Sequence, residues 1–92
     1  MNVKYSPSLL NMLKKHDVRI RKSFKEKITI FSKNPNDPEL NNHSLREPYQ
    51  DRKSIDITND YRAHYKEIKE EDEIVAYFVS LGTYQELYRK SN

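Results

Sequence analysis

The second half of the chain carries side chains that could cut a phosphodiester bond without a metal. His43 can act as an acid or a base near neutral pH. Arg52 and Arg62 can bind phosphate oxygens through bidentate guanidinium contacts. Tyr84 and Tyr88 offer rings for stacking on bases and phenols for proton transfer, although a reference pKa of about 10 requires help from adjacent cations. These residue types together suit the binding and cleavage of single-stranded RNA.

Strand alternation predicts that the cations share one face of a sheet. Residues 54–58 and residues 61–66 alternate in side-chain type, so we expect two strands joined by a turn at residues 58–60. Successive residues of a strand point to opposite faces, and the apolar set, which includes Ile55 and Ala63, should face the core. The side chains left on the open face are Arg52, Ser54, Asp56, Thr58, Arg62, His64 and Lys66.

Each of these features also has a purely structural explanation. A two-layer domain always has a solvated polar sheet face, so the cations there need not bind a ligand. Tyr84 and Tyr88 could serve only to pack the end of the chain onto the sheet. His16 falls at the end of a predicted helix and is interpreted as a surface or capping residue. His43 falls in a loop, and His64 could contact RNA or simply be solvated.

Charge is distributed unevenly along the chain. Residues 1–33 are strongly basic, with only Asp17 and Glu26 as acids, while acidic side chains gather in residues 67–73. Such an asymmetry suits a polyanionic partner on one face. A solvated helix with a basic outer surface would produce the same pattern.

The first half of the chain predicts a short strand and a pair of helices. Residues 2–5 form the strand, and Ser6-Pro7 begins a helix with the serine at its N-cap. This helix should pause around His16-Asp17, where the aspartate can cap a second helix with apolar residues at close to helical spacing. Two prolines within residues 34–38 should end the second helix, because proline cannot continue a helix interior.

The remaining residues predict further strands and complete the fold class. Residues 74–81 form a nearly continuous apolar run, typical of a central strand buried on both faces, and residues 69–72 form the tip of a hairpin. Residues 85–88 suit either a last strand or a helical turn. We therefore expect residues 1–92 to form a single α+β domain in two layers. Its N-terminal strand and helical hairpin should pack on an antiparallel sheet of about four strands.

Composition excludes several kinds of site. The chain has no cysteine and no histidine pair with metal-ligand spacing, so we expect no disulfide and no metal site. Gly82 is the only glycine, which excludes a glycine-rich phosphate loop. No run approaches the roughly 20 apolar residues of a membrane span, and no signal peptide is visible. We therefore expect a cytoplasmic protein with no small-molecule cofactor and no membrane partner.

Four segments carry a resemblance to a known family. They are Asn42-His43-Ser44-Leu45, Arg52-Lys53-Ser54-Ile55-Asp56-Ile57, Asp60-Tyr61-Arg62-Ala63-His64-Tyr65 and Gly82-Thr83-Tyr84-Gln85-Glu86-Leu87-Tyr88. Their order and spacing resemble the RelE family of toxins from bacterial toxin–antitoxin pairs, within the RelE/ParE superfamily and nearest its YafQ-like branch. The likeness covers nearly the whole chain, and the expected architecture is accordingly a two-layer RelE-like fold.

The resemblance implies a ribosome-dependent endoribonuclease, an mRNA interferase that inhibits translation. The RNA 2′-hydroxyl would attack the adjacent phosphate without metal or cofactor and leave a 2′,3′-cyclic phosphate or its hydrolysed product. The expected catalytic residues are His43, Asp60, Arg62, Tyr84 and Tyr88. The expected RNA- and phosphate-binding residues are Arg52, Lys53, Tyr61, His64 and Tyr49. The expected partners are the ribosome, the message and a cognate antitoxin whose acidic segment folds onto the basic surface.

The resemblance also implies roles for individual side chains. His43 and Asp60 would do acid–base or orienting work, and the two arginines would stabilise phosphate charge. Tyr88 would stack on a base or help to shuttle a proton. The general base could be His43, Asp60 or Tyr84.

Two positions depart from the family pattern. Tyr84 and Asp56 stand where YafQ-like toxins often have histidine, which removes two side chains suited to proton transfer at neutral pH. Other RelE-type toxins use arginine, lysine and tyrosine instead. The alternatives are a catalytically weak or silent binding protein of the same fold, a gyrase inhibitor like the ParE branch, or a plain RNA-binding module. Convergence of Arg52, Arg62, His43 and Tyr88 on one concave face would favour cleavage, whereas scattered side chains would favour the binding alternatives.

Overall fold

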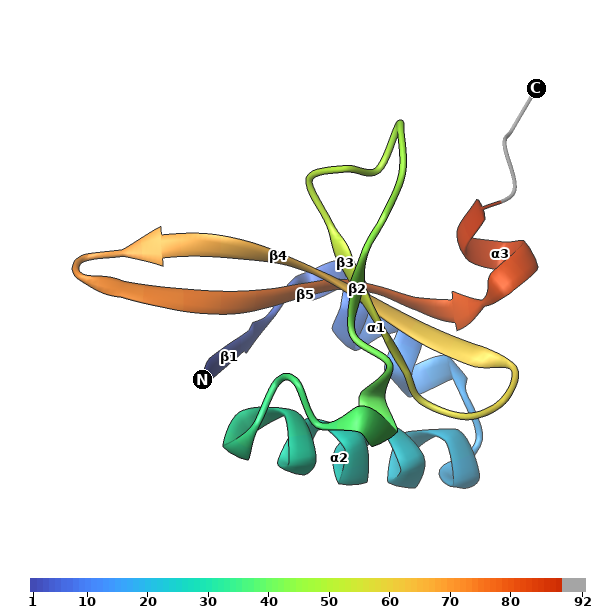
Figure 1. The fold of residues 1–92 in the computed structure, drawn as a ribbon. Coiled ribbons are helices and arrows are strands. Elements are labelled where there is room, and N and C mark those ends of the chain that lie inside the picture. Colours follow the sequence, from blue (N-terminus) through green and yellow to red (C-terminus); the bar gives the residue numbers. More distant parts are fainter. Residues whose placement is uncertain (89–92) are drawn as a thin grey trace.

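Residues 1–88, which the computed structural model describes, form a layer of helices packed on one face of a sheet (Figure 1). In chain order the elements are β1 (Asn2–Tyr5), α1 (Pro7–Lys15), α2 (Val18–Lys33), the 3₁₀ turn η1 (Pro38–Leu40), β2 (His43–Ser44), β3 (Lys53–Asp56), β4 (Tyr61–Glu70), β5 (Glu73–Thr83) and α3 (Tyr84–Tyr88). The strand order is β1-β5-β4-β3-β2. The predicted α+β architecture is confirmed, although this part of the chain has five strands rather than about four. The sheet is also mixed rather than antiparallel throughout, because β1 runs parallel to β5.

The helices begin and end where the sequence predicts. The Ser6 hydroxyl accepts the Leu9 N–H at 2.9 Å, and the Asp17 carboxylate accepts the Ile20 N–H at 3.0 Å. Each side chain thereby satisfies one backbone donor that the first turn of a helix leaves free. α2 stops at Lys33, just before the two prolines. No helix within residues 1–88 is long and apolar enough to cross a membrane.

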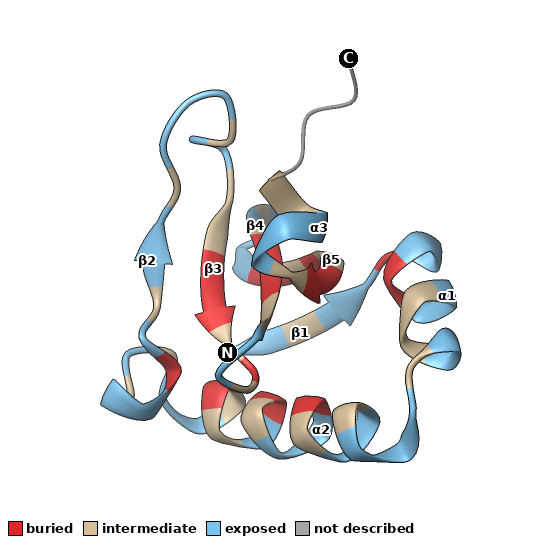
Figure 2. Cartoon of the chain, turned by 90° about the vertical axis from the view of Figure 1, so that its right-hand side faces the viewer, coloured by how far each residue is buried: buried red, intermediate tan, exposed pale blue. Residues whose placement is uncertain are grey.

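The apolar stripe of α2 joins the two layers. Its buried residues, Phe24, Ile28 and Phe31, lie on the side of the helix that faces the sheet (Figure 2). The fully buried Phe31 ring packs edge-on against Tyr65 of β4 and Phe78 of β5, with ring centroids 5.0 and 5.3 Å apart. This aromatic contact fixes α2 over the two central strands.

A β-bulge in the central hairpin keeps one face of β5 in the core. His64 pairs with Ser80, but the next residue, Tyr65, pairs with Phe78, so Val79 is an extra residue on β5. A bulge shifts the alternation of the following side chains by one position. Phe78 and Leu81 are three residues apart and are nevertheless both buried in the core. The sequence gives no signal for this bulge.

The predicted burial of residues 74–81 on both faces is wrong for Ile74 and incomplete for Tyr77, although Val75 and Ala76 are buried. Ile74 is 49% exposed, and Tyr77 is half-buried. The reason is geometric, because the β4–β5 hairpin extends beyond the helical layer, as Figure 1 shows. Its turn lies at Glu71-Asp72, within the predicted tip, and Glu71 adopts a left-handed φ of 54°.

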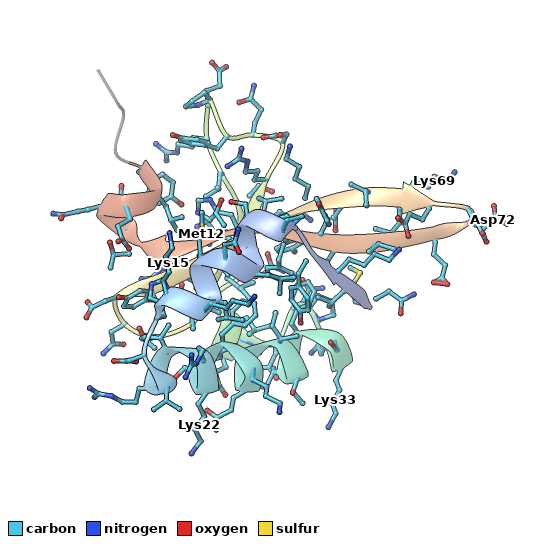
Figure 3. The ribbon with its side chains drawn as sticks, turned by 180° about the vertical axis from the view of Figure 1, so that it is seen from behind. Met12, Lys15, Lys22, Lys33, Lys69 and Asp72 are labelled. Carbon is cyan, nitrogen blue, oxygen red and sulfur yellow. The ribbon has the colours of Figure 1, made fainter. Side chains whose placement is uncertain are left out.

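The basic N-terminal third of the chain lies on the helical layer. Lys22 and Lys33 project from α2 away from the sheet (Figure 3). Lys27 is held by Glu39 at 2.7 Å. The basic residues of α2 therefore form a surface separate from the open face of the sheet, where the site residues are predicted.

Replacing Phe31 with alanine tests how far the two layers depend on this ring. Phe31→Ala should lower the free energy of unfolding by about 3–5 kcal/mol, because it removes a fully buried ring and leaves a cavity. Val18→Ala, at a position 70% exposed, serves as the control and should change it by less than about 0.5 kcal/mol. Urea unfolding followed by circular dichroism measures both. Equal effects of the two changes would contradict the packing described.

Candidate active site

Four polar side chains form a row across the sheet, on the face turned away from α1 and α2. His43 of β2 pairs with Ser54 of β3, Ser54 pairs with His64 of β4, and His64 pairs with Ser80 of β5. Directly paired residues point to the same face of a sheet. The neighbouring Ile55 points the other way, into the core, as the alternation predicts. His43 and His64 thus flank one serine.

A hollow of about 410 Å³ opens between the β2–β3 loop and α3. We call it the tyrosine hollow, after the three tyrosines in its lining. The lining includes His43, Arg46, Tyr49, Tyr84 and Tyr88. All of these except Arg46 are predicted site residues, so a single concavity brings together side chains from two segments of the chain that are far apart in sequence.

The Gly-Thr-x-x-Glu segment turns the chain from β5 into α3. The Thr83 N–H donates to Glu86 Oε1 at 2.8 Å, and the Glu86 N–H donates to the Thr83 hydroxyl at 3.2 Å, which is a reciprocal capping box. Gly82 provides the space, because a Cβ atom there would lie 3.0 Å from Glu86 Oε1 and 3.2 Å from Glu86 Cβ. Residues 85–88 therefore form a helical turn, which decides between the two predicted alternatives.

Tyr88 lies where α3 meets the sheet. Its phenol oxygen is 3.0 Å from Nε2 of His64, and its ring packs against Tyr49 and Tyr84 with centroids 5.8 and 4.5 Å apart. Burial raises the pKa of the Tyr88 phenol above its usual value, and the Ser54 hydroxyl beside it opposes that shift. Tyr84, which packs against Tyr88, is 66% exposed.

His64 is not the exposed cation that alternation predicts. Its side chain points to the predicted face, but α3 covers that face and leaves only 1% of the residue exposed. Burial lowers the pKa of His64 to about 4, and the charges of Arg52 and His43 add to the effect. The imidazole is therefore neutral near pH 7, and the prediction of an open, cationic His64 is wrong.

His43, in contrast, is exposed at the rim of the hollow. Its Nδ1 lies 2.7 Å from the backbone carbonyl of Asn41. A carbonyl can only accept, so Nδ1 carries the proton of the neutral ring and Nε2 keeps its lone pair. His43 is thus oriented with a free proton acceptor on its other side.

Arg52 is a half-buried cation beside the hollow. Its guanidinium lies over the Tyr49 ring, 5.6 Å from the centroid. Within residues 1–88, the buried Arg52 Nε has no hydrogen-bond partner, and Asp51 approaches it only to 3.8 Å. Buried polar groups are rarely left unpaired, so this Nε marks a position that can accommodate a polar ligand.

The guanidinium of Arg62 is hydrogen-bonded to the turn that precedes it in the chain. Its Nη1 donates to the carbonyls of Thr58, Asn59 and Tyr61 at 2.8–3.1 Å. Its Nε lies 2.9 Å from Asp56 Oδ1, an ion pair without a directed hydrogen bond. Arg62 shares the face of His64 as predicted, but here it holds the β3–β4 turn.

Three predicted site residues lie away from the hollow. Asp60 and Tyr61 border a separate depression against the start of α2. Tyr61 packs edge-on against His16, with ring centroids 5.2 Å apart, and belongs to the layer between helices and sheet. Lys53 precedes the open-face residue Ser54 on β3, so its side chain points to the helical side. Its Nζ lies 3.4 Å from Glu67 Oε2. The structure therefore does not bring these three to the tyrosine hollow.

Sequence reasoning missed three residues that build the site. Glu86 closes the capping box, and its spacing from Thr83 is a signal that the sequence does contain. Ser54 appears in the sequence as one of several open-face residues, and only the register shows that it lies between two histidines. Arg46 lines the hollow from a loop whose course has no sequence signal.

No protein-family model matches the chain, and no curated protein matches it in sequence. Solved structures match its fold. The YoeB/ParE toxin from Agrobacterium tumefaciens has a TM-score of 0.72 at 15% identity, over 91% of this chain and 99% of that chain. YafQ from E. coli strain BL21(DE3) has a TM-score of 0.72 at 18% identity, over 95% and 97%. The chain has the fold of the RelE/ParE-like toxins.

An archaeal relative extends the RelE-like comparison. The RelE–RelB complex from Pyrococcus horikoshii OT3 matches with a TM-score of 0.68 at 20% identity, over 89% of this chain and 92% of that chain. The structural neighbours thus include RelE, YoeB/ParE and YafQ toxins, and the predicted RelE-like fold is confirmed. Identities this low establish the fold, so the chemistry has to be argued from the residues of this chain.

The buried His64 makes stability depend on pH. Its pKa is about 4 in the folded protein and 6.5 as the reference, so the unfolded chain binds more protons between these values. The free energy of unfolding should therefore fall as the pH drops from 6.5 towards 4. His64→Gln should flatten this dependence, measured by urea unfolding across the same pH range. The same slope in both proteins would show that His64 titrates normally.

Proposed function

We propose that this chain is the toxin of a type II toxin–antitoxin pair and cleaves messenger RNA on the ribosome without a metal. The observation that carries the proposal is the convergence of His43, Arg52 and Tyr88 around the tyrosine hollow. The RNA 2′-hydroxyl attacks the adjacent phosphorus and the bond to the 5′-oxygen breaks. A 2′,3′-cyclic phosphate and a 5′-hydroxyl result. The RelE-like fold supports this reading because its neighbours are toxins.

His43 is the proposed general base. Its Nδ1 proton is directed to the Asn41 carbonyl, which leaves Nε2 free to take the proton of the 2′-hydroxyl. Its exposure at the rim of the hollow allows RNA to approach. Tyr84 and Asp60 are weaker candidates, because Tyr84 has no such orienting contact within residues 1–88 and Asp60 borders a different depression.

Arg52 is the proposed electrostatic stabiliser of the phosphate. Charge builds on the non-bridging oxygens during the attack, and a fixed guanidinium in a partly dry site opposes it effectively. The ring of Tyr49 holds the guanidinium on one side, and within residues 1–88 the buried Arg52 Nε has no hydrogen-bond partner that a phosphate oxygen would have to displace. Arg62 is a poorer candidate because its Nη1 is already committed to the β3–β4 turn and its Nε faces Asp56.

Tyr88 is the proposed general acid. Burial raises its pKa, so the phenol keeps its proton at neutral pH and can give it to the leaving 5′-oxygen. A base with this pKa would be almost fully protonated and therefore ineffective. Tyr84, exposed beside it, offers a ring on which a nucleobase of single-stranded RNA can stack.

The proposed regulator is a cognate antitoxin. Similar structures of toxins include complexes with a second protein, DinJ with YafQ and RelB with RelE. The exposed basic residues of the helical layer suit an acidic segment that folds onto this chain. To block access of RNA to His43, the antitoxin would also have to reach the tyrosine hollow, because the hollow is separate from the basic surface of α2.

A cleavage assay on translating ribosomes tests the proposal. Primer extension on a defined message should map cuts in the ribosomal A site. His43→Ala and Arg52→Ala should each slow cleavage by about 100-fold or more, because each removes one proposed catalytic contribution. Lys33→Ala, which changes an exposed lysine that projects from α2 away from the sheet, is the control and should cut normally.

An intact message in the presence of wild-type protein would contradict the proposal. The environment of Arg62 and His64 favours a non-catalytic second function. Arg62 is hydrogen-bonded to the β3–β4 turn and His64 is neutral, so few charged groups are free to take part in catalysis. The protein would then be a RelE-fold binding protein. Pull-down of its antitoxin by a protein that fails to cut would favour this second reading.

A further inference from the structure

We propose that His64 is a positioning residue for the cleavage reaction, whose Nε2–H donates to the Tyr88 phenol oxygen and turns the phenol proton into the tyrosine hollow. This inference rests on the proposed function and adds a buried partner to its general acid. When Tyr88 gives its proton to the leaving 5′-oxygen, the O–H bond of the phenol breaks and the leaving oxygen gains the proton. The resulting phenolate keeps the hydrogen bond from His64.

The geometry ties the two side chains together. His64 Nε2 lies 3.0 Å from the Tyr88 oxygen, and the ring centroids are 5.2 Å apart at an angle of 56°. His64 stands in the centre of the sheet with 1% of its surface exposed, so water does not compete for this contact. Tyr88 contacts His64 from α3, and the capping box of Thr83 and Glu86 holds this helix in place.

The charge state of His64 excludes a direct role as a base. Burial and the nearby Arg52 and His43 lower the pKa of His64 to about 4, so near pH 7 the ring is neutral and carries one N–H. A group with this pKa accepts a proton poorly at neutral pH. The same neutral ring can still donate one hydrogen bond, and a donor to the phenol oxygen leaves the phenol proton free to face the substrate.

Two properties of the site favour this direction of donation. The phenol has a single proton, and a proton donated to His64 would not be available to the leaving oxygen. Burial raises the pKa of the Tyr88 phenol overall, whereas the Ser54 hydroxyl and the charge of Arg62 act in the opposite sense and favour the ionised form. A donor at His64 acts in the same sense, so the three groups together stabilise the phenolate as it forms.

A sulfur-substituted message separates this role from a purely structural one. A thiolate leaves without a proton, so a message with a 5′-bridging sulfur at the cut linkage does not need the acid. His64→Leu should slow cleavage of the oxygen-linked message by about 10- to 100-fold, with KM unchanged, and cut the sulfur-linked message at nearly the wild-type rate. His64→Gln, whose amide N–H can occupy the place of Nε2–H, should recover part of the loss.

Tyr88→Phe and one matched variant complete the test. Tyr88→Phe should show the same pattern, and the double variant with His64→Leu should be no slower than Tyr88→Phe alone, because both remove one function. Tyr5→Phe is the matched control, because Tyr5 of β1 packs on Phe24 and Phe78 and is not among the residues that line the tyrosine hollow. It should cut both messages normally.

Three outcomes would overturn the inference. Equal losses of His64→Leu on both messages would mean that His64 only supports the structure. Unchanged cleavage of both would mean that the phenol needs no partner, or that its proton points to His64. Wild-type protein that cuts neither message would overturn the proposed function, and this inference with it, whereas the first two outcomes leave the proposed function standing.

Discussion

The pairing of β4 with β5 determines which side chains face the helices and which face the candidate active site. The extra residue Val79 lets Phe78 and Leu81 both enter the core although three positions separate them. Without the bulge, one half of β5 would turn its apolar residues outward. On β4, the same register places Tyr65 against Phe31 in the core. The side chain of the preceding residue, His64, therefore points to the opposite face. The core and the site therefore depend on one strand alignment.

The site combines buried polar groups with a short helix, α3, that covers them. α3 has five residues, too few for an independent helix, and it stays folded through its capping box and the contact of Tyr88 with His64. Beside the tyrosine hollow, the buried Arg52 Nε lacks a hydrogen-bond partner within residues 1–88. Unpaired buried groups cost stability, and such costs concentrate where a protein binds or transforms a ligand. In the proposed reaction, an RNA phosphate would satisfy the arginine.

Local features of the fold could be predicted from the sequence, and the site could be predicted only in part. The caps at Ser6 and Asp17 depend on neighbours three residues away, and strand alternation correctly separated the two faces of β4. The burial of His64 and the engagement of Arg62 could not be predicted in this way. The first depends on α3 folding back over the sheet, and the second on backbone carbonyls that converge only when the β3–β4 turn forms. Both are contacts whose geometry no residue pattern specifies.

Attack by the RNA 2′-hydroxyl, assisted by His43, Arg52 and Tyr88, is the centre of this account. The most direct measurement uses a message with a single 2′-deoxynucleotide on the 5′ side of a mapped cleavage position, translated beside the all-ribose message. The ribose message should be cleaved, with a 2′,3′-cyclic phosphate on the upstream fragment by mass spectrometry, and no cleavage should occur at the deoxynucleotide. Cleavage of both messages at that position would contradict this mechanism, because the nucleophile would then have to be water or a side chain.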